Sequence, residues 1–166
     1  MAQNLELKAK VDSFDEILMR LEKVAAEDKG VLNQKDTYYK YDKGRLKLRS
    51  VNGRFELIKY RRDESAEQRY SNYFLLYLEG DEVEEYLNDI LQVEVIVEKS
   101  RRLFIYKDTR IHLDEVKNLG TFMELETLVL NGHEDAEVRF NEIIELLGLN
   151  KENEIRVSYR ELMLAK

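Results

Sequence analysis

Residues 98–127 read EKSRRLFIYKDTRIHLDEVKNLGTFMELET, and charged and apolar side chains alternate along much of this stretch. Successive side chains of a β-strand point to opposite faces, so the alternation predicts strands with one apolar and one charged face. One face of the two clearest runs comprises Arg110, His112, Asp114, Phe122, Glu124 and Glu126. A single strand of this kind is most simply a half-solvated strand, with its apolar face on a core and its charged face in water.

The same alternation recurs in three further segments, which are NLELKAKV (4–11), RLKLR (45–49) and, less regularly, ELIKYRR (56–62). Its repetition favours strands that close on themselves, with apolar faces outward under helices and charged faces inward. We therefore predict an α+β fold built on a closed or nearly closed antiparallel β-barrel. This barrel would form a tunnel with a charged lumen and would be flanked by helices.

Helical spacing of apolar residues predicts helices at about 14–27, 81–91 and 134–147, and a short helix or helical turn in the tail 157–164. Ser13 and Glu16 resemble a capping box at the start of the first helix, which we expect to end at Gly30 and to cover the outer side of the barrel. The polar segment DESAEQR (63–69) has no apolar period and is predicted to be an exposed loop.

The composition limits the class of protein. The chain has 166 residues, no Pro, no Cys and a formal net charge of -7. This length suits one domain over residues 1–166, and the absence of Cys excludes disulfides and thiolate metal sites. The negative charge argues against nucleic-acid binding. The sequence shows neither an apolar run of roughly 18 residues nor a cleavable signal pattern, so we expect a cytoplasmic protein that does not engage a membrane.

A lumen of this composition predicts what it would contain. Burying like charges together costs several kcal/mol per uncompensated ion, so a basic lumen requires water or a polyanion such as a triphosphate. Carboxylates in the same lumen would repel the phosphates unless a hard divalent cation lies between them. The sequence has no Gly-rich phosphate loop, so side chains would have to hold the phosphates.

Several short motifs occur in an order that resembles the CYTH family of triphosphate tunnel metalloenzymes. They are NLELK (4–8), QKDTYY (34–39), RLKLR (45–49), EKSR (98–101), HLD (112–114), GTFMELE (120–126) and SYREL (158–162). This family includes class IV adenylyl cyclases, thiamine triphosphatases and inorganic triphosphatases. One position departs from its pattern, because Asn4 stands where the signature Glu-x-Glu-x-Lys has its first carboxylate.

The resemblance implies a set of site residues. Carboxylates at the family's acidic positions would bind Mg²⁺ or Mn²⁺, and these are Glu6, Asp114, Glu124 and Glu126. Basic residues at the tunnel positions would bind the triphosphate, and these are Lys8, Lys47, Arg49, Lys59, Lys99 and Arg101. Lys8 is also a candidate catalytic proton acceptor, if surrounding cations depress the pKa of its amine. His112 shares the face of Asp114, but an isolated strand histidine is more often a structural residue.

The function that we expect is divalent-metal-dependent hydrolysis of a triphosphate, with tripolyphosphate, a nucleoside triphosphate or thiamine triphosphate as substrate. A class IV adenylyl cyclase, which converts ATP to cyclic AMP and pyrophosphate, is one alternative. A non-catalytic polyphosphate or nucleotide-binding module is the other, because the first signature carboxylate is missing. The family also suggests a homodimer.

Overall fold

The computed structural model describes residues 2–62 and 70–166, so the predicted loop at 63–69 lies outside the described residues. The elements in chain order are β1 (Ala2–Lys10), α1 (Asp15–Lys23), β2 (Glu27–Tyr39), β3 (Arg45–Val51), β4 (Arg54–Arg62), β5 (Tyr70–Leu78), α2 (Val83–Ile90), β6 (Val93–Tyr106), β7 (Thr109–Val116), β8 (Gly120–Leu128), α3 (His133–Leu146), the 3-10 helix η1 (Lys151–Asn153) and α4 (Tyr159–Leu164).

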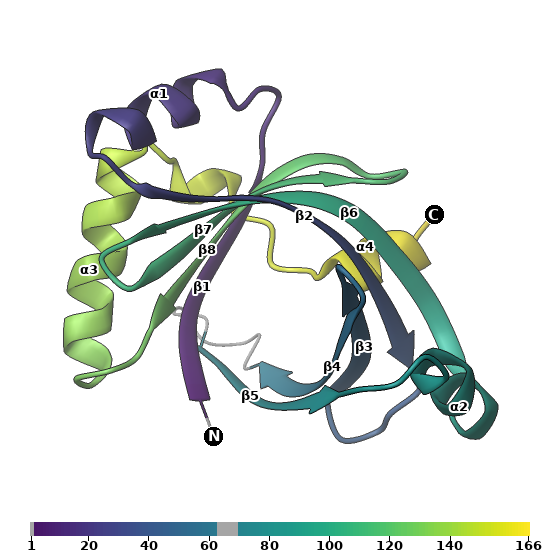
Figure 1. The fold of residues 1–166 in the computed structure, drawn as a ribbon. Helices are drawn as coiled ribbons and strands as arrows, with labels where there is room; N and C mark the ends of the chain where they lie inside the picture. The colour runs from purple at the N-terminus through teal and green to yellow at the C-terminus, as the bar shows by residue number, and fades with distance from the viewer. Residues whose placement is uncertain (1, 63–69) are drawn as a thin grey trace.

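The strands form a closed antiparallel barrel in the order β1-β5-β4-β3-β2-β6-β7-β8 (Figure 1). Closure occurs at β1, because Leu5 is opposite Tyr70 of β5 on one side and Thr127 of β8 on the other. The predicted α+β fold with a closed barrel and flanking helices is therefore confirmed.

Strand register separates the two faces of the barrel. On β1, β8 and β7, Lys8, Glu124 and His112 are consecutive partners across the sheet, so their side chains share the inner face. The apolar residues between them face outward and pack under α1 and α3. This outer core includes Leu7, Leu125, Ile111, Ile17, Leu21, Phe140 and Ile143. Because the apolar side chains of these strands are buried under the helices, the charged side chains that alternate with them must point into the barrel.

The start of α1 differs from the prediction. Phe14 is the N-cap residue and makes no side-chain capping bond, so the predicted Ser13–Glu16 capping box is wrong. The Ser13 hydroxyl accepts a hydrogen bond from the Asp15 amide, at 3.2 Å. Phe14 instead packs against the outer core, and this contact places the first turn of the helix.

The end of α1 also differs. The helix ends at Lys23, and β2 begins at Glu27, upstream of Gly30. Gly30, with φ +84°, lies inside β2 at a register shift against β6. A bulge there needs a positive φ, which glycine adopts without strain, so Gly30 shapes a strand and does not end a helix.

The C-terminal segment lies against the inner face at one end of the barrel. Ser158 and Glu161 form a capping box at the start of α4. Tyr159 is buried with Tyr38, Val97, Val116 and Phe122. The predicted tail helix is thus present, and it contributes to the lumen. Within the described residues, no helix is both long and apolar enough to cross a membrane.

Candidate functional site

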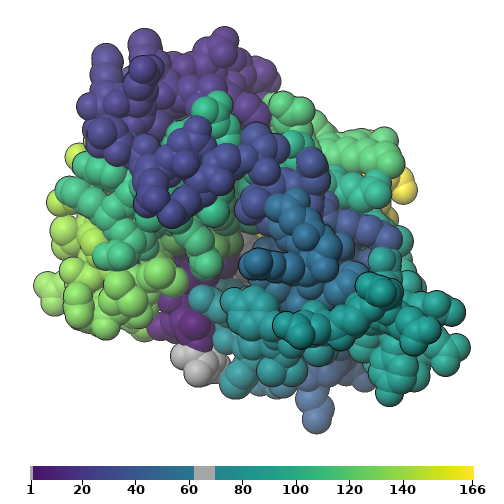
Figure 2. Space-filling view, viewed as in Figure 1, coloured from purple at the N-terminus to yellow at the C-terminus, as the bar shows by residue number. Residues whose placement is uncertain are grey.

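The barrel encloses a cavity of about 690 Å³ that is lined from all eight strands and from the C-terminal segment. Figure 2 shows the surface hollowed between the β7–β8–β1 part and the β3–β4–β5 part of the barrel. Most of the residues implied by the resemblance line this cavity, and they are Glu6, Lys8, Lys47, Arg49, Lys99, Arg101, Glu124 and Glu126.

A basic cluster is organised around Asp36 of β2, whose side chain is 1% exposed. Lys47 Nζ donates to Oδ2 at 2.9 Å, Arg49 donates to both oxygens at 2.8 and 2.9 Å, and Lys99 Nζ lies 3.7 Å away. Burial acts to raise the pKa of Asp36, but the charges of Arg49, Lys47 and Lys99 outweigh it and hold the pKa well below its usual value. Asp36 was not predicted as a site residue, although it alternates with Gln34 and Tyr38 along β2 and so shares their face.

Arg101 belongs to a second buried cluster. Its Nε donates to Asp114 Oδ1 at 2.7 Å and its Nη2 donates to Oδ2 at 2.6 Å. The Tyr159 hydroxyl also donates to Oδ2, at 2.8 Å. Asp114 is fully buried and both of its oxygens accept hydrogen bonds, so it orients Arg101. Asp114 is not among the three residues whose ligand atoms lie within 4.8 Å of one another, although Arg101 Nη2 contacts both Asp114 and Glu124, so its role as a metal ligand stays a prediction.

Two lysines flank the Tyr159 ring. Lys8 Nζ lies 4.3 Å from the ring centroid and donates to the Val157 carbonyl at 3.0 Å, and Lys99 Nζ lies 5.0 Å from the same centroid. Burial, with the nearby charge of Arg101, lowers the pKa of Lys99 to about 7. Lys8 has Glu124 directly across the ladder. Its surroundings therefore include a carboxylate and are not the purely cationic environment that the proton-acceptor prediction required.

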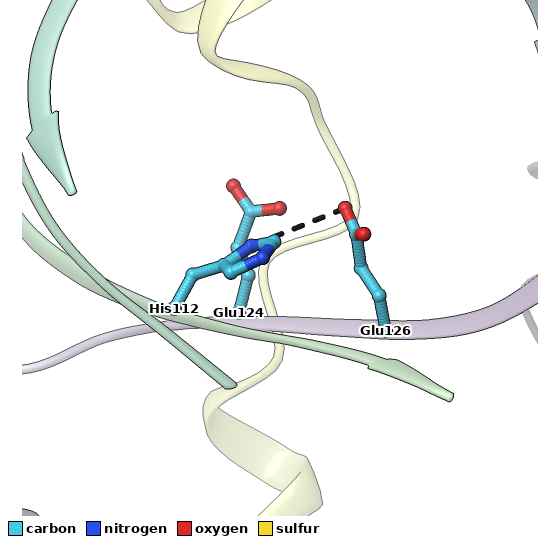
Figure 3. Close-up of side chains that lie close together, drawn as sticks. All are labelled: His112, Glu124 and Glu126. Atoms are coloured by element: carbon cyan, nitrogen blue, oxygen red, sulfur yellow. Dashed lines mark ion pairs between the residues drawn. The ribbon is translucent and has the colours of Figure 1, made fainter. Parts of the chain in front are cut away.

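An acidic group occupies the β7–β8 wall (Figure 3). One ligand atom from each of His112, Glu124 and Glu126 lies within 4.8 Å of the other two. Glu6 is directly opposite Glu126 on β1 and lines the same cavity. Burial acts to raise the pKa of Glu126, yet Arg110 and His112 lower it to about 2, so this carboxylate is ionised at neutral pH. Burial and Arg101 lower the pKa of His112 to about 4, which leaves the imidazole neutral.

Lys59 does not line the lumen. Its Nζ lies 5.7 Å from the ring centroids of both Tyr41 and Phe74, and Phe74 is 54% exposed on the outside. Ile58 and Tyr60 line the cavity from β4 instead. The prediction for Lys59 was wrong because β4 carries apolar and charged residues on both faces, so alternation does not define which face is inner.

An aromatic and apolar strip of the lumen wall on β5 was not predicted from the sequence. Tyr73, Leu75 and Tyr77 of β5 line the cavity, with Tyr73 next to Arg110 and Tyr77 75% exposed. These residues alternate along the strand, which is the signal that could have identified them.

A model of the CYTH domain family matches residues 2–159, so the chain belongs to this family. A protein of Methanocaldococcus jannaschii that carries the provisional name adenylate cyclase is 27% identical over 182 residues, covering 95% of this chain and 97% of the relative.

Solved structures share the fold. A protein from Pyrococcus horikoshii has a TM-score of 0.80 at 21% identity, covering 96% of this chain and 98% of the other. A Hippeastrum protein, provisionally named an adenylyl cyclase and described as having a dominant triphosphatase activity, has a TM-score of 0.68 at 11% identity, covering 100% and 97%.

Proposed function

We propose that this protein is a divalent-metal-dependent enzyme that binds a triphosphate in the barrel lumen and hydrolyses it. The observation that carries the proposal is the basic cluster, in which Asp36 faces Lys47, Arg49 and Lys99. One carboxylate cannot neutralise three cations whose side chains are at most 16% exposed, and the Arg101 guanidinium, itself paired with Asp114, lies close enough to lower the pKa of Lys99. A polyanion that spans this cluster would offset the cost of keeping these charges together.

The acidic group fits a hard divalent cation, Mg²⁺ or Mn²⁺. Glu124, Glu126 and Glu6 offer carboxylate oxygens to the lumen. The Asn4 Oδ1 atom, also on the inner face of β1, is buried without a hydrogen-bond partner among the described residues, so an uncharged oxygen is available where the family signature has a carboxylate. When bound, such a cation would neutralise charge on the phosphoryl oxygens.

The chain's own residues would position the reactants. Arg49 and Arg101, each oriented by a buried carboxylate, present guanidinium groups that bind phosphate oxygens, and Lys47 adds a point charge. A water molecule would attack the terminal phosphorus as the bridging P–O bond breaks, and its proton would pass to an amine. Lys8 was the candidate from the sequence. Lys99, whose pKa is lowered to about 7 in the chain without ligand, is a second candidate acceptor.

A second candidate activity is the cyclisation of ATP. It is favoured by the wall formed by Tyr73, Leu75 and Tyr77, which can hold a planar base beside the phosphate site. The provisional name of the Methanocaldococcus relative agrees with it, whereas the description of the Hippeastrum protein agrees with hydrolysis.

The test is turnover of tripolyphosphate, ATP and thiamine triphosphate with Mg²⁺ or Mn²⁺, with the products resolved by phosphorus NMR. Hydrolysis of tripolyphosphate gives orthophosphate and pyrophosphate, whereas cyclisation of ATP gives pyrophosphate and cyclic AMP. Glu126→Gln should abolish turnover, and Glu115→Gln, which alters an exposed carboxylate of β7, should not. Tight binding of triphosphate without turnover in either metal would contradict the enzymatic proposal and favour a binding module.

A further inference from the structure

The acidic group contains an imidazole to which the proposed function gives no role. His112 and Glu124 are directly opposite each other on β7 and β8, and Glu126 follows on the same face of β8. Figure 3 shows the His112 ring and the two carboxylates turned toward one another. The strand ladder holds all three side chains, so their convergence does not depend on a loop.

The imidazole is buried with an unsatisfied nitrogen. His112 is 4% exposed, and its Nδ1 has no hydrogen-bond partner among the described residues. Glu126 Oε1 lies 4.0 Å from Nδ1, which is too far for a hydrogen bond. Buried polar atoms are normally paired with protein, water or an ion, and two carboxylates beside this nitrogen make a cation a suitable partner for it.

All three side chains line the cavity of the lumen, and Arg101 Nη2 lies 3.5 Å from Glu124 Oε1. Arg110 Nη2 lies 2.9 Å from Glu126 Oε2, on the oxygen that does not face the imidazole. Partners of this kind orient carboxylate ligands at metal sites. Asp114, the other inner carboxylate of β7, is occupied by Arg101 and Tyr159. On the inner face of β7, Arg110 is a cation and Asp114 is occupied, so His112 is the residue in position to contribute a ligand.

We propose that His112 is a nitrogen ligand of the divalent cation held by Glu124 and Glu126, and that it makes the site prefer a first-row transition ion such as Mn²⁺ over Mg²⁺. This inference rests on one part of the proposed function, which is the divalent cation bound by Glu124 and Glu126. Imidazole suits first-row transition ions, whereas Mg²⁺ takes oxygen ligands and retains its waters. A site of two carboxylates and one imidazole should therefore discriminate between the two ions.

The experiment uses the full chain loaded with Mn²⁺ alone, without a triphosphate. Pulsed EPR should detect hyperfine coupling from a directly bound ¹⁴N, and incorporation of ¹⁵N-histidine should change it to the ¹⁵N pattern. The chain has two histidines, and the second supplies a matched control. His133, at the start of α3, stacks on Tyr70 with ring centroids 4.1 Å apart. His133→Asn should keep the coupling, and His112→Asn should lose it.

Calorimetry then measures the preference between the ions. We expect His112→Asn to weaken Mn²⁺ binding by at least about tenfold. Removal of a residue that only supports a metal ligand already weakens metal binding by about this factor, and removal of a ligand should weaken it at least as much. Mg²⁺ binding should change much less. Bound Mn²⁺ without nitrogen coupling in the wild-type chain, with binding still lost in Glu126→Gln, would overturn the role of His112 and leave the proposed function standing. Failure of the wild-type chain to bind either ion would overturn both. Because the wild-type spectrum is decisive, the test does not depend on whether His112→Asn folds.

Discussion

Two buried aspartates illustrate what alternation can and cannot predict at the scale of a residue. The pattern in 112–114 places Asp114 on the inner face of β7, as the structure confirms, but it does not say which side chain Asp114 meets there. The partner is Arg101, from a neighbouring strand. Asp36 likewise binds residues of β3 and β6. Roles that depend on contacts between strands are beyond a one-dimensional pattern.

Asp36→Asn should destabilise the protein in the absence of ligand. The change keeps the shape of the side chain but leaves Lys47, Arg49 and Lys99 without their counter-charge, and breaking a buried ion pair in this way typically costs about 3–5 kcal/mol. Thermal unfolding should show a large fall in Tm, and tripolyphosphate should restore more stability to the variant than to the wild type.

Asp28→Asn provides the control for this change. Asp28 pairs with Arg102 in a contact whose side chains are about two-fifths exposed, so its loss should cost no more than about 1 kcal/mol. If Asp36→Asn were as mild as Asp28→Asn, Asp36 would not be neutralising a crowded cationic cluster.

Lys99 should make stability depend on pH. Its pKa is lowered from 10.5 to about 7 in the folded chain, so between these values the unfolded chain binds more protons. The free energy of unfolding should therefore rise with pH between about 7 and 10.5, by at most about 1.4 kcal/mol per pH unit. Below pH 7 the contribution of Lys99 to this free energy should not change with pH. The measurement is the difference between wild type and Lys99→Met in denaturant unfolding across this range. A difference that is independent of pH would show that Lys99 is not a desolvated cation.

At the scale of elements, sequence patterns predicted the helices and strands well and their ends less well. The predicted capping box of α1 is absent, whereas one is present at Ser158 of α4. Both sites have a serine followed three residues later by a glutamate. What separates them is tertiary contact: Phe14 packs into the outer core, whereas Ser158 is buried next to Tyr159.

This difference predicts unequal effects of the same substitution. Ser158→Ala removes a hydroxyl that accepts from the Glu161 amide and should cost about 1 kcal/mol. Ser13→Ala should cost a few tenths of a kcal/mol, since Ser13 is not the N-cap residue of α1. Denaturant unfolding of the two variants compares them directly. Equal losses would contradict the assigned helix start.

At the scale of the molecule, barrel closure is what creates the site. β1 lies between β5 and β8, which brings Glu6 opposite Glu126 and Lys8 opposite Glu124, although these residues are far apart in the sequence. Alternation predicted that charged faces turn inward, and the resemblance implied which of the charged residues belong to the site. Alternation could not predict the direction of the Lys59 side chain, because both faces of β4 carry apolar and charged residues.

The central claim is that the lumen binds a triphosphate, and its most direct test is a melting series without metal. Phosphate, pyrophosphate and tripolyphosphate are compared at fixed ionic strength. A ligand that binds only the folded chain raises Tm, and longer phosphates reach more of the cluster formed by Lys47, Arg49, Lys99 and Arg101. We predict that Tm rises in the order phosphate, pyrophosphate, tripolyphosphate. Surface cations would be screened equally by all three at matched ionic strength, so a flat series would contradict a triphosphate site in the lumen.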